Sequence, residues 1–168
     1  GIIGYVGRQE AAPILLEGLE RMEYRGYDST GMAVCGDGVL RVCKKKGRVQ
    51  VLREMSHDGA DLPGTLGIGH TRWATHGEPS DVNAHPHLSQ SGKFAVVHNG
   101  IIENFIALKE ELLQKGYTFR SETDTEVVAQ LLDYYYSDCG DFFEAMNRLL
   151  HAVDGAYALG IICADYPD

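Results

Sequence analysis

Two apolar segments separated by a tight turn restrict the fold of this chain more than any other feature. Met32–Cys35 and Val39–Cys43 have the length and side-chain types of strands, and Gly36-Asp37-Gly38 between them suits a β-hairpin turn. A hairpin joins antiparallel neighbours, and the helical patterns elsewhere do not alternate strictly with strands. The sequence therefore favours an α+β fold with antiparallel strands over a doubly wound parallel sheet.

The remaining apolar patterns predict further strands and helices. Runs typical of strands cover Ile2–Val6, Leu66–His70, Phe94–Val97 and Ala156–Cys163. Helical spacing is found over Glu10–Met22, 47–55 and Phe105–Leu112, and two more helices are expected to begin after Thr123 and Asp141. We expect the polar stretch Thr71–Lys93 to be a long loop too irregular for the core.

The charge balance and hydropathy exclude several classes of protein. Fifteen Lys and Arg against 24 Asp and Glu give 168 residues a net charge of −9, which argues against a nucleic-acid binder or a membrane-surface protein. No apolar run is long enough for a membrane helix, and no secretion signal opens the chain. We expect a single soluble domain of cytoplasmic location. Its four cysteines have no CxxC spacing and are expected to be small apolar side chains.

The densest group of polar residues is the segment HTRWATHG, residues 70–77, which follows a predicted strand. Arg72 carries a planar guanidinium that suits a carboxylate, and Thr75 and His76 offer further donors. The alternative is a surface ion pair for Arg72 and a structural role for His76.

A second candidate is His98-Asn99-Gly100, directly after another apolar strand. A side-chain amide beside a glycine N–H is one way to build an oxyanion hole, in which two donors stabilise a developing negative oxygen. The alternative is an ordinary Asn-Gly turn.

Carboxylates in SETDTE, residues 121–126, open a predicted helix, where the helix dipole favours them. Asp124 could be a counter-ion for an ammonium group, or only a helix cap. If the fold brings Arg72 and Asp124 together, the pair would match the zwitterionic end of an amino acid.

Histidines suggest a metal site, because His85-Pro86-His87 lies near His70 and His76 in the sequence. The spacing matches no metal motif, and no cysteine joins the group. A histidine-based metallohydrolase is therefore a distant alternative, and hydrogen bonding within the loop is the expectation.

Several ordered motifs together resemble one family. They are GIIG at the start, LLEGL, EYRGYDS, HTRWATHG, NAHPH, HNGIIEN and SETDTE. This series is similar to the glutaminase domain of the glucosamine-6-phosphate synthase family, the class II glutamine amidotransferases that act on fructose 6-phosphate. The resemblance covers nearly the whole chain. The glutaminase domains of purine-pathway amidotransferases rank second, since they carry different blocks around Tyr24–Asp28 and Trp73.

The resemblance implies a fold and a reaction. The fold would be the four-layer αββα sandwich of N-terminal-nucleophile hydrolases. The reaction would be hydrolysis of L-glutamine to glutamate and ammonia without a cofactor or metal. Ammonia would pass to fructose 6-phosphate on a C-terminal isomerase domain, in an enzyme expected to be a homo-oligomer.

The resemblance also implies roles for individual residues. Arg72 would hold the substrate α-carboxylate and Asp124 its α-ammonium, while Asn99 and the backbone of Gly100 would form the oxyanion hole. Thr75 and His76 would line the glutamine pocket, and Trp73 would lie near the ammonia route. Arg25 would help to position the N-terminal loop, and His85 would lie toward the sugar-binding partner domain.

The sequence departs from the family at its two ends. The nucleophilic cysteine is expected immediately before Gly1, and a modified first residue, a trimmed chain or an inactive domain would each account for its absence. At the other end we expect residues 1–168 to be a truncated glutaminase domain, without the isomerase domains. A catalytically inactive module that binds an amino acid is the main alternative function.

Overall fold

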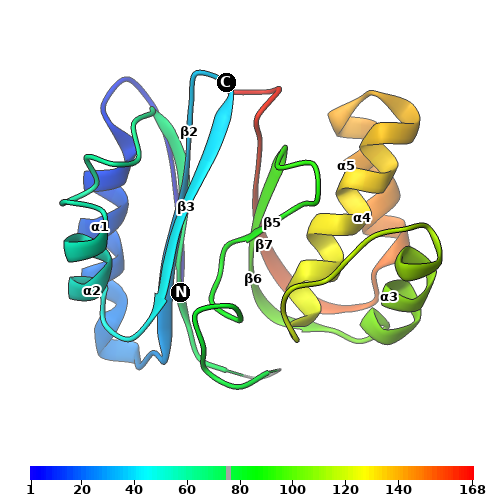
Figure 1. Ribbon diagram of the computed structural model, residues 1–168, viewed down its shortest axis with the longest axis horizontal. Coiled ribbons are helices and arrows are strands. Elements are labelled where there is room, and N and C mark those ends of the chain that lie inside the picture. Colours follow the sequence, from blue (N-terminus) through cyan, green and yellow to red (C-terminus); the bar gives the residue numbers. More distant parts are fainter. Residues whose placement is uncertain (75–76) are drawn as a thin grey trace.

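The computed structural model describes residues 1–74 and 77–168, and its elements form four layers. Two antiparallel sheets face each other in the middle, and helices cover the outer face of each sheet (Figure 1). This αββα order confirms the fold class expected from the sequence.

The first sheet has the strand order β1-β4-β2-β3. Its strands are β1 (Ile2–Val6), β2 (Ser29–Gly36), β3 (Val39–Lys46) and β4 (Leu66–Arg72). Its outer face is covered by α1 (Ala11–Met22) and α2 (Val49–Met55), and a short 3-10 turn, η1 (Glu23–Arg25), follows α1. The apolar stripe of α1, which includes Leu15, Leu16 and Leu19, is fully buried against this sheet.

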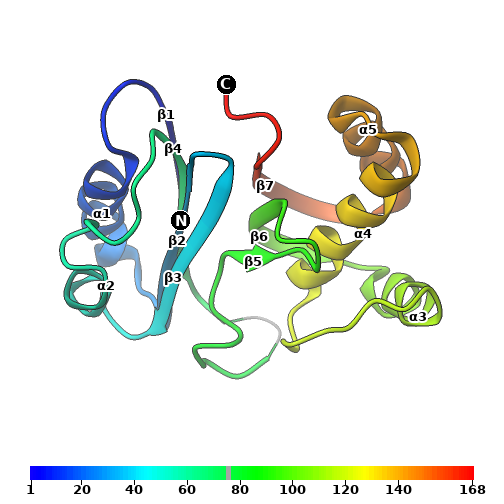
Figure 2. The same ribbon diagram turned by 45° about the horizontal axis from the view of Figure 1, so that its top comes forward.

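The second sheet has the order β5-β6-β7. Its strands are β5 (His87–Leu88), β6 (Phe94–Ile102) and β7 (Gly155–Cys163). Three helices cover its outer face: α3 (Phe105–Gln114), α4 (Asp124–Cys139) and α5 (Phe142–Ala152). Figure 2, turned toward the top of the molecule, shows these helices on the side away from the first sheet.

Strand β6 shows why the layers hold together. Successive side chains of a strand point to opposite faces, and here both faces are apolar. Phe94 and Val96 pack against the helices, while Ala95 and Val97 pack between the sheets. The inter-sheet cluster also takes Ala33 from the first sheet, so one strand contributes to two of the three cores.

The predicted hairpin is confirmed, with longer strands than the apolar pattern indicated. Ser29–Gly36 pairs with Val39–Lys46 in antiparallel register. Both turn residues have positive φ angles, 52° at Asp37 and 72° at Gly38, as a type I′ turn requires.

Two expectations about local structure are wrong. The stretch after β4 is not excluded from the core, because Asn83–His87 is buried and leads into β5. The strand predicted over Phe94–Val97 does not end there, because β6 continues through His98-Asn99-Gly100 to Ile102 and pairs with β7, which also rules out the alternative of an Asn-Gly turn. In the part of the chain that the structure describes, no helix is long and apolar enough to cross a membrane.

Candidate functional site

The candidate site lies where β4 ends, between the two sheets. Gly1 is placed there by the register of β1 against β4, in which Ile2 lies opposite His70. The Gly1 amine donates to the carbonyl oxygen of Thr71 at 2.8 Å and to its Oγ1 at 2.9 Å. A cavity of about 250 Å³ opens at this place, lined by His70, Arg72, Trp73, His85, His98, Asn99, Gly100, Ile101, Thr123, Asp124 and Thr125.

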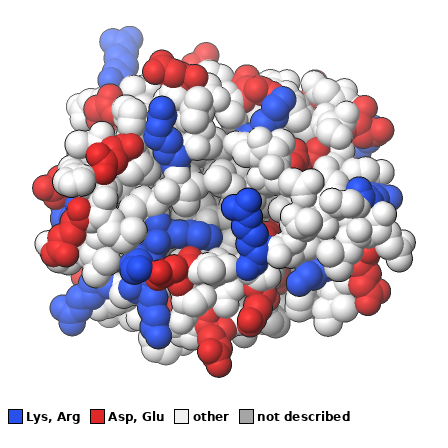
Figure 3. Space-filling model, viewed as in Figure 1, with Lys and Arg blue, Asp and Glu red and all other residues white. Residues whose placement is uncertain are grey.

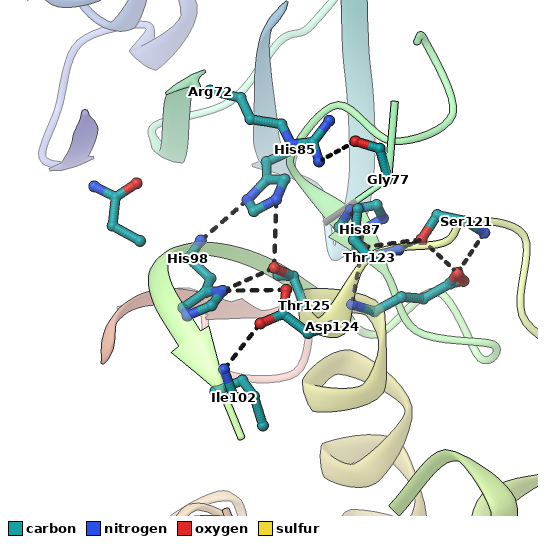
Figure 4. Close-up of polar contacts among 12 residues, drawn as sticks. Arg72, Gly77, His85, His87, His98, Ile102, Ser121, Thr123, Asp124 and Thr125 are labelled. Carbon is teal, nitrogen blue, oxygen red and sulfur yellow. Dashed lines mark hydrogen bonds and ion pairs between the residues drawn. The ribbon is translucent and has the colours of Figure 1, made fainter. Parts of the chain in front are cut away.

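Arg72 is the cation of this cavity. Its side chain is buried at the end of β4, and Nη2 donates to the carbonyl oxygen of Gly77 at 3.2 Å (Figure 4). Burial lowers the pKa of the guanidinium, and the charges of Asp28 and Asp124 oppose that shift. An arginine stays protonated in such a place, so Arg72 presents a fixed positive charge.

Asp124 is the anion of the same cavity and is 3% exposed. It is the first residue of α4, and Oδ2 accepts a hydrogen bond from the backbone N–H of Ile102 at 2.9 Å (Figure 4). The cap of α4 is Thr123, whose side chain accepts from the N–H of Glu126. Asp124 is therefore not merely the helix cap, and its carboxylate sits at the positive end of the helix dipole.

Asn99 and Gly100 lie inside β6, where they pair with Ala158 and Tyr157 of β7. Both are exposed to the cavity. Gly100 has a φ of 113°, and a Cβ at this position would overlap the carbonyl oxygen of Ala156. Only glycine fits at this position. Because the strand is paired with β7, the backbone N–H of Gly100 is held in place beside the Asn99 amide.

Three of the histidines that line the cavity, His70 of β4, His85 just before β5 and His98 of β6, pack near one another. The His70 and His85 rings stack with centroids 4.2 Å apart, and His85 lies 6.4 Å from His98. The N–H of His98 donates to Nδ1 of His85 at 3.2 Å, and Nε2 of His85 lies 3.3 Å from Oγ1 of Thr125 (Figure 4). Burial lowers the pKa of His70 to about 3 and that of His85 well below its ordinary value. The His70 and His85 rings are therefore neutral polar groups at physiological pH.

His85, which the resemblance places toward a partner domain, lies inside this domain. It is 5% exposed, and its ring contacts other histidines of this chain because Asn83–His87 folds into the core. Sequence reasoning did not select His70, His98 or Thr125 as site residues. Their positions in the sequence could have indicated them, because each lies within two residues of a predicted site residue on the same strand or helix.

Trp73 and Arg25 lie at the open side of the site. Trp73 is 71% exposed, and its ring is 3.3 Å from where a Cβ of Gly26 would stand. Arg25 is exposed on η1, where Nε donates to the hydroxyl of Tyr24 at 3.0 Å. Its charge contributes to a lowered pKa of the Gly1 amine, whose main cause is burial. Thr75 and His76 lie outside the described residues.

The surface has a second cavity, away from these residues. This larger cavity, of about 730 Å³, lies near β3 and β5 and is lined by residues such as Lys44, Gln90 and Arg120, with none of the residues selected from the sequence. Lys44 is tied there by bonds from Nζ to the carbonyl oxygens of Ala84 at 2.8 Å and Pro86 at 3.1 Å. Figure 3 shows acidic and basic side chains intermixed over this face. Within residues 1–74 and 77–168, no cluster of three or more His, Cys, Asp or Glu could hold a metal ion.

The layer order and the paired charges beside an amide and a glycine N–H are consistent with a domain that binds an amino acid and cleaves an amide. A family model described as a glutamine amidotransferase domain matches residues 34–162. The chain belongs to this family.

Curated relatives refine the comparison. The chain is 61% identical over 168 residues to a glutamine–fructose-6-phosphate aminotransferase [isomerizing] of Caldanaerobacter subterraneus, and 55% identical over 168 residues to the protein of that name from Clostridium tetani. Each alignment covers 100% of this chain and 27% of the relative. The chain thus spans about a quarter of the length of these relatives.

Solved structures agree on the fold. A glutamine phosphoribosylpyrophosphate amidotransferase from B. subtilis superimposes with a TM-score of 0.81 and 29% identity, covering 97% of this chain and 35% of that one. This likeness confirms the N-terminal-nucleophile hydrolase type of fold. The identity to this purine-pathway type is about half that to the aminotransferases, so the second-ranked resemblance is not favoured.

Proposed function

We propose that this chain is the glutaminase domain of a longer enzyme and hydrolyses the side-chain amide of L-glutamine. The observation that carries the proposal is the pair of buried opposite charges, Arg72 and Asp124, lining one cavity with Asn99 and Gly100. Arg72 would bind the α-carboxylate and Asp124 the α-ammonium, because a planar guanidinium and a carboxylate at a helix start match these groups. Both charges are desolvated, so each would contribute more than a surface ion pair does.

The Asn99 side chain and the Gly100 N–H would stabilise the negative charge that develops on the amide carbonyl oxygen when its carbon is attacked. Two fixed donors beside a charge that develops only in the transition state lower the barrier without tightening substrate binding. Thr75 and His76 remain expected contacts of the glutamine, and Trp73 a residue near the route of ammonia. Arg25 remains an expected positioning residue of the N-terminal loop.

The nucleophile would be a cysteine placed before Gly1. Extending the β1–β4 register by one residue puts this position opposite Arg72. Directly opposed residues of an antiparallel pair share a face, so the thiol would lie on the same face as His70 and Arg72. It would attack the amide carbon and release ammonia, leaving a thioester that water hydrolyses to glutamate.

The α-amino group of that cysteine would carry the proton from the thiol to the leaving nitrogen. An α-amino group titrates near neutral pH, which suits this transfer. Arg25 contributes to the lowered pKa of the Gly1 amine. In the same way it would favour the neutral, proton-accepting form of the α-amino group of a cysteine placed before Gly1.

The rest of the reaction rests on the relatives. Their name assigns them an aminotransferase reaction with fructose 6-phosphate, and they are longer than the region that aligns with this chain. We infer that the longer enzyme passes the ammonia to fructose 6-phosphate on a C-terminal isomerase domain, giving glucosamine 6-phosphate. A homo-oligomer and a cytoplasmic location are part of this proposal.

The test compares two forms of the protein, one with cysteine and one with serine immediately before Gly1. The cysteine form should release glutamate and ammonia from glutamine at a rate at least about 10³-fold higher, the scale of losing a nucleophile. Glutamine with its α-carboxylate amidated or its α-amine acetylated should be a poor substrate of the same form. Tight binding of glutamine without turnover by the cysteine form would instead support an inactive amino-acid-binding module.

A further inference from the structure

His70 connects the two sheets at the site by a hydrogen bond to Asn99. Its Nε2 lies 2.9 Å from Oδ1 of Asn99 and 3.0 Å from the backbone carbonyl oxygen of His98. His70 belongs to β4 in the first sheet, whereas both acceptors belong to β6 in the second. One ring nitrogen therefore contacts two neighbouring oxygens across the space between the sheets.

The backbone carbonyl of His98 fixes the direction of both bonds. A carbonyl oxygen can only accept, so Nε2 of His70 must carry the ring hydrogen and donate. A donating nitrogen needs an acceptor at Asn99 as well, which means that Asn99 presents its oxygen to His70. The amide NH₂ of Asn99 must then point away from the ring, on the side of the cavity that Asn99 and Gly100 line.

The His70 ring is itself held in place. It is 2% exposed and stacks on His85 with an angle of 17° between the ring planes. Burial lowers the pKa of His70 to about 3, so the ring is neutral and keeps its single donor at Nε2. Asn99, by contrast, is exposed and would be free to turn its amide over without this bond.

We propose that His70 is a positioning residue for the oxyanion hole, which orients the side-chain amide of Asn99 so that its NH₂ faces the developing oxyanion. This inference rests on the proposed glutaminase function. An amide turned the other way would point its oxygen at the negative charge and repel it. Because the oxyanion exists only in the transition state, loss of this orientation lowers kcat and leaves KM nearly unchanged.

The test compares His70→Met with His70→Gln in the protein that carries cysteine before Gly1. Methionine fills the space without a donor, whereas the amide nitrogen of glutamine can donate to the same two oxygens. We expect kcat to fall about 10- to 100-fold in His70→Met, less than the 10²- to 10³-fold loss typical of removing an oxyanion donor. KM should stay within about threefold, and His70→Gln should recover most of the loss.

A double-mutant cycle separates this role from a general structural one. In the Asn99→Ala background there is no amide to orient, so His70→Met should change kcat less than about twofold. An equal fold-loss in both backgrounds, or a His70→Met enzyme with kcat within twofold of its parent, would overturn the proposal.

A measurement on the unaltered ring keeps the proposal testable if His70→Met does not fold. Nitrogen chemical shifts of ¹⁵N-labelled histidine should show His70 protonated at Nε2 and not at Nδ1, and the opposite tautomer would overturn the inference. Failure of the proposed function is distinguishable, because the parent protein would then release no glutamate while the ring tautomer could still be measured.

Discussion

The two sheets contribute unlike parts to the candidate site. The first sheet contributes the positive charge of Arg72, the last residue of β4, and the backbone of Gly1, which lies next to the paired strands β1 and β4. The second sheet and α4 bring the amide of Asn99, the N–H of Gly100 and the carboxylate of Asp124. The groups that would hold substrate come from both halves, whereas the groups that would stabilise the oxyanion come from the second alone.

Strand geometry explains this division. Strand β4 ends at Arg72, and Asn83–His87, further along the chain, is buried in the core. Strand β6 continues through the site and stays paired with β7 on both sides of Asn99 and Gly100. Donors inside a paired strand are held more precisely than groups at a strand end, which is what an oxyanion hole requires.

The largest effect is expected from Gly100→Ala in the second sheet. The added methyl group would overlap the carbonyl oxygen of Ala156 and impose a φ of 113° on an L-residue. We expect a loss of about 4 kcal/mol in the free energy of unfolding and no measurable glutaminase activity. Urea denaturation and a glutamate-release assay would measure the two effects.

Gly92→Ala is the matched control. Gly92 also has a positive φ, 77°, but nothing lies within 4 Å of the position of its Cβ. The Gly92→Ala variant should lose only about 1 kcal/mol in the free energy of unfolding and keep its glutaminase activity. Equal losses at the two glycines would show that backbone strain alone, and not the contact with β7, restricts Gly100.

The next largest effect concerns three buried histidines, His70, His85 and His87. Burial lowers the pKa of each, to about 3 for His70 and well below the ordinary value of 6.5 for the other two. Below pH 6.5 the unfolded chain takes up protons that the folded chain does not, so stability falls with falling pH.

Between pH 7 and pH 5.5 we expect the three histidines together to reduce the free energy of unfolding by about 3–4 kcal/mol. Chemical denaturation at the two pH values measures the change. A variant of the exposed His151, such as His151→Asn, should keep the same pH dependence. Unchanged stability at pH 5.5 would show that these rings bind protons in the folded state.

A smaller effect is expected from Asp124→Asn, which tests the charge that α4 contributes. Asparagine keeps an oxygen that can accept from the N–H of Ile102, so β6 should stay in place. The loss of the charge should raise KM for glutamine about 10- to 100-fold, with kcat less affected. Steady-state kinetics measure both constants.

Arg21→Met provides a reference for charge removal away from the site, because Arg21 is exposed on α1 and pairs there with Glu17. It should leave KM unchanged. If Asp124→Asn also leaves KM unchanged, Asp124 does not bind the substrate ammonium.

Much of the fold could be predicted because the apolar pattern of each segment matches the layer in which that segment lies. Both faces of Phe94–Val97 are apolar, and the structure places this strand between two cores. The polar and apolar pattern was misleading where polar residues are buried, because the polar residues around His85 and His87 predicted a surface loop. Their burial depends on partners far away in the sequence, such as Thr125 for His85 and Thr123 for His87.

The site shows the same limit. Residue types suggested roles for Arg72, Asn99 and Asp124, but only the fold brings them to one cavity. No local pattern connects His70 with Asn99, because the bond crosses between strands of different sheets. Local signals identify which groups are chemically suited, and the topology decides which of them meet.

The smallest effect is expected from Gly4→Ala, the same substitution as Gly100→Ala but in the first sheet. The added Cβ would lie 4.0 Å from the nearest atom, the carbonyl oxygen of Gly67, and φ is not positive at Gly4. Alanine restricts the unfolded chain more than glycine does, so this variant should be about 0.5 kcal/mol more stable and fully active. Urea denaturation would detect the gain. A destabilised Gly4→Ala would mean that a methyl group is not tolerated even where the structure leaves room for it, and the cost of Gly100→Ala could then not be assigned to its contact with Ala156.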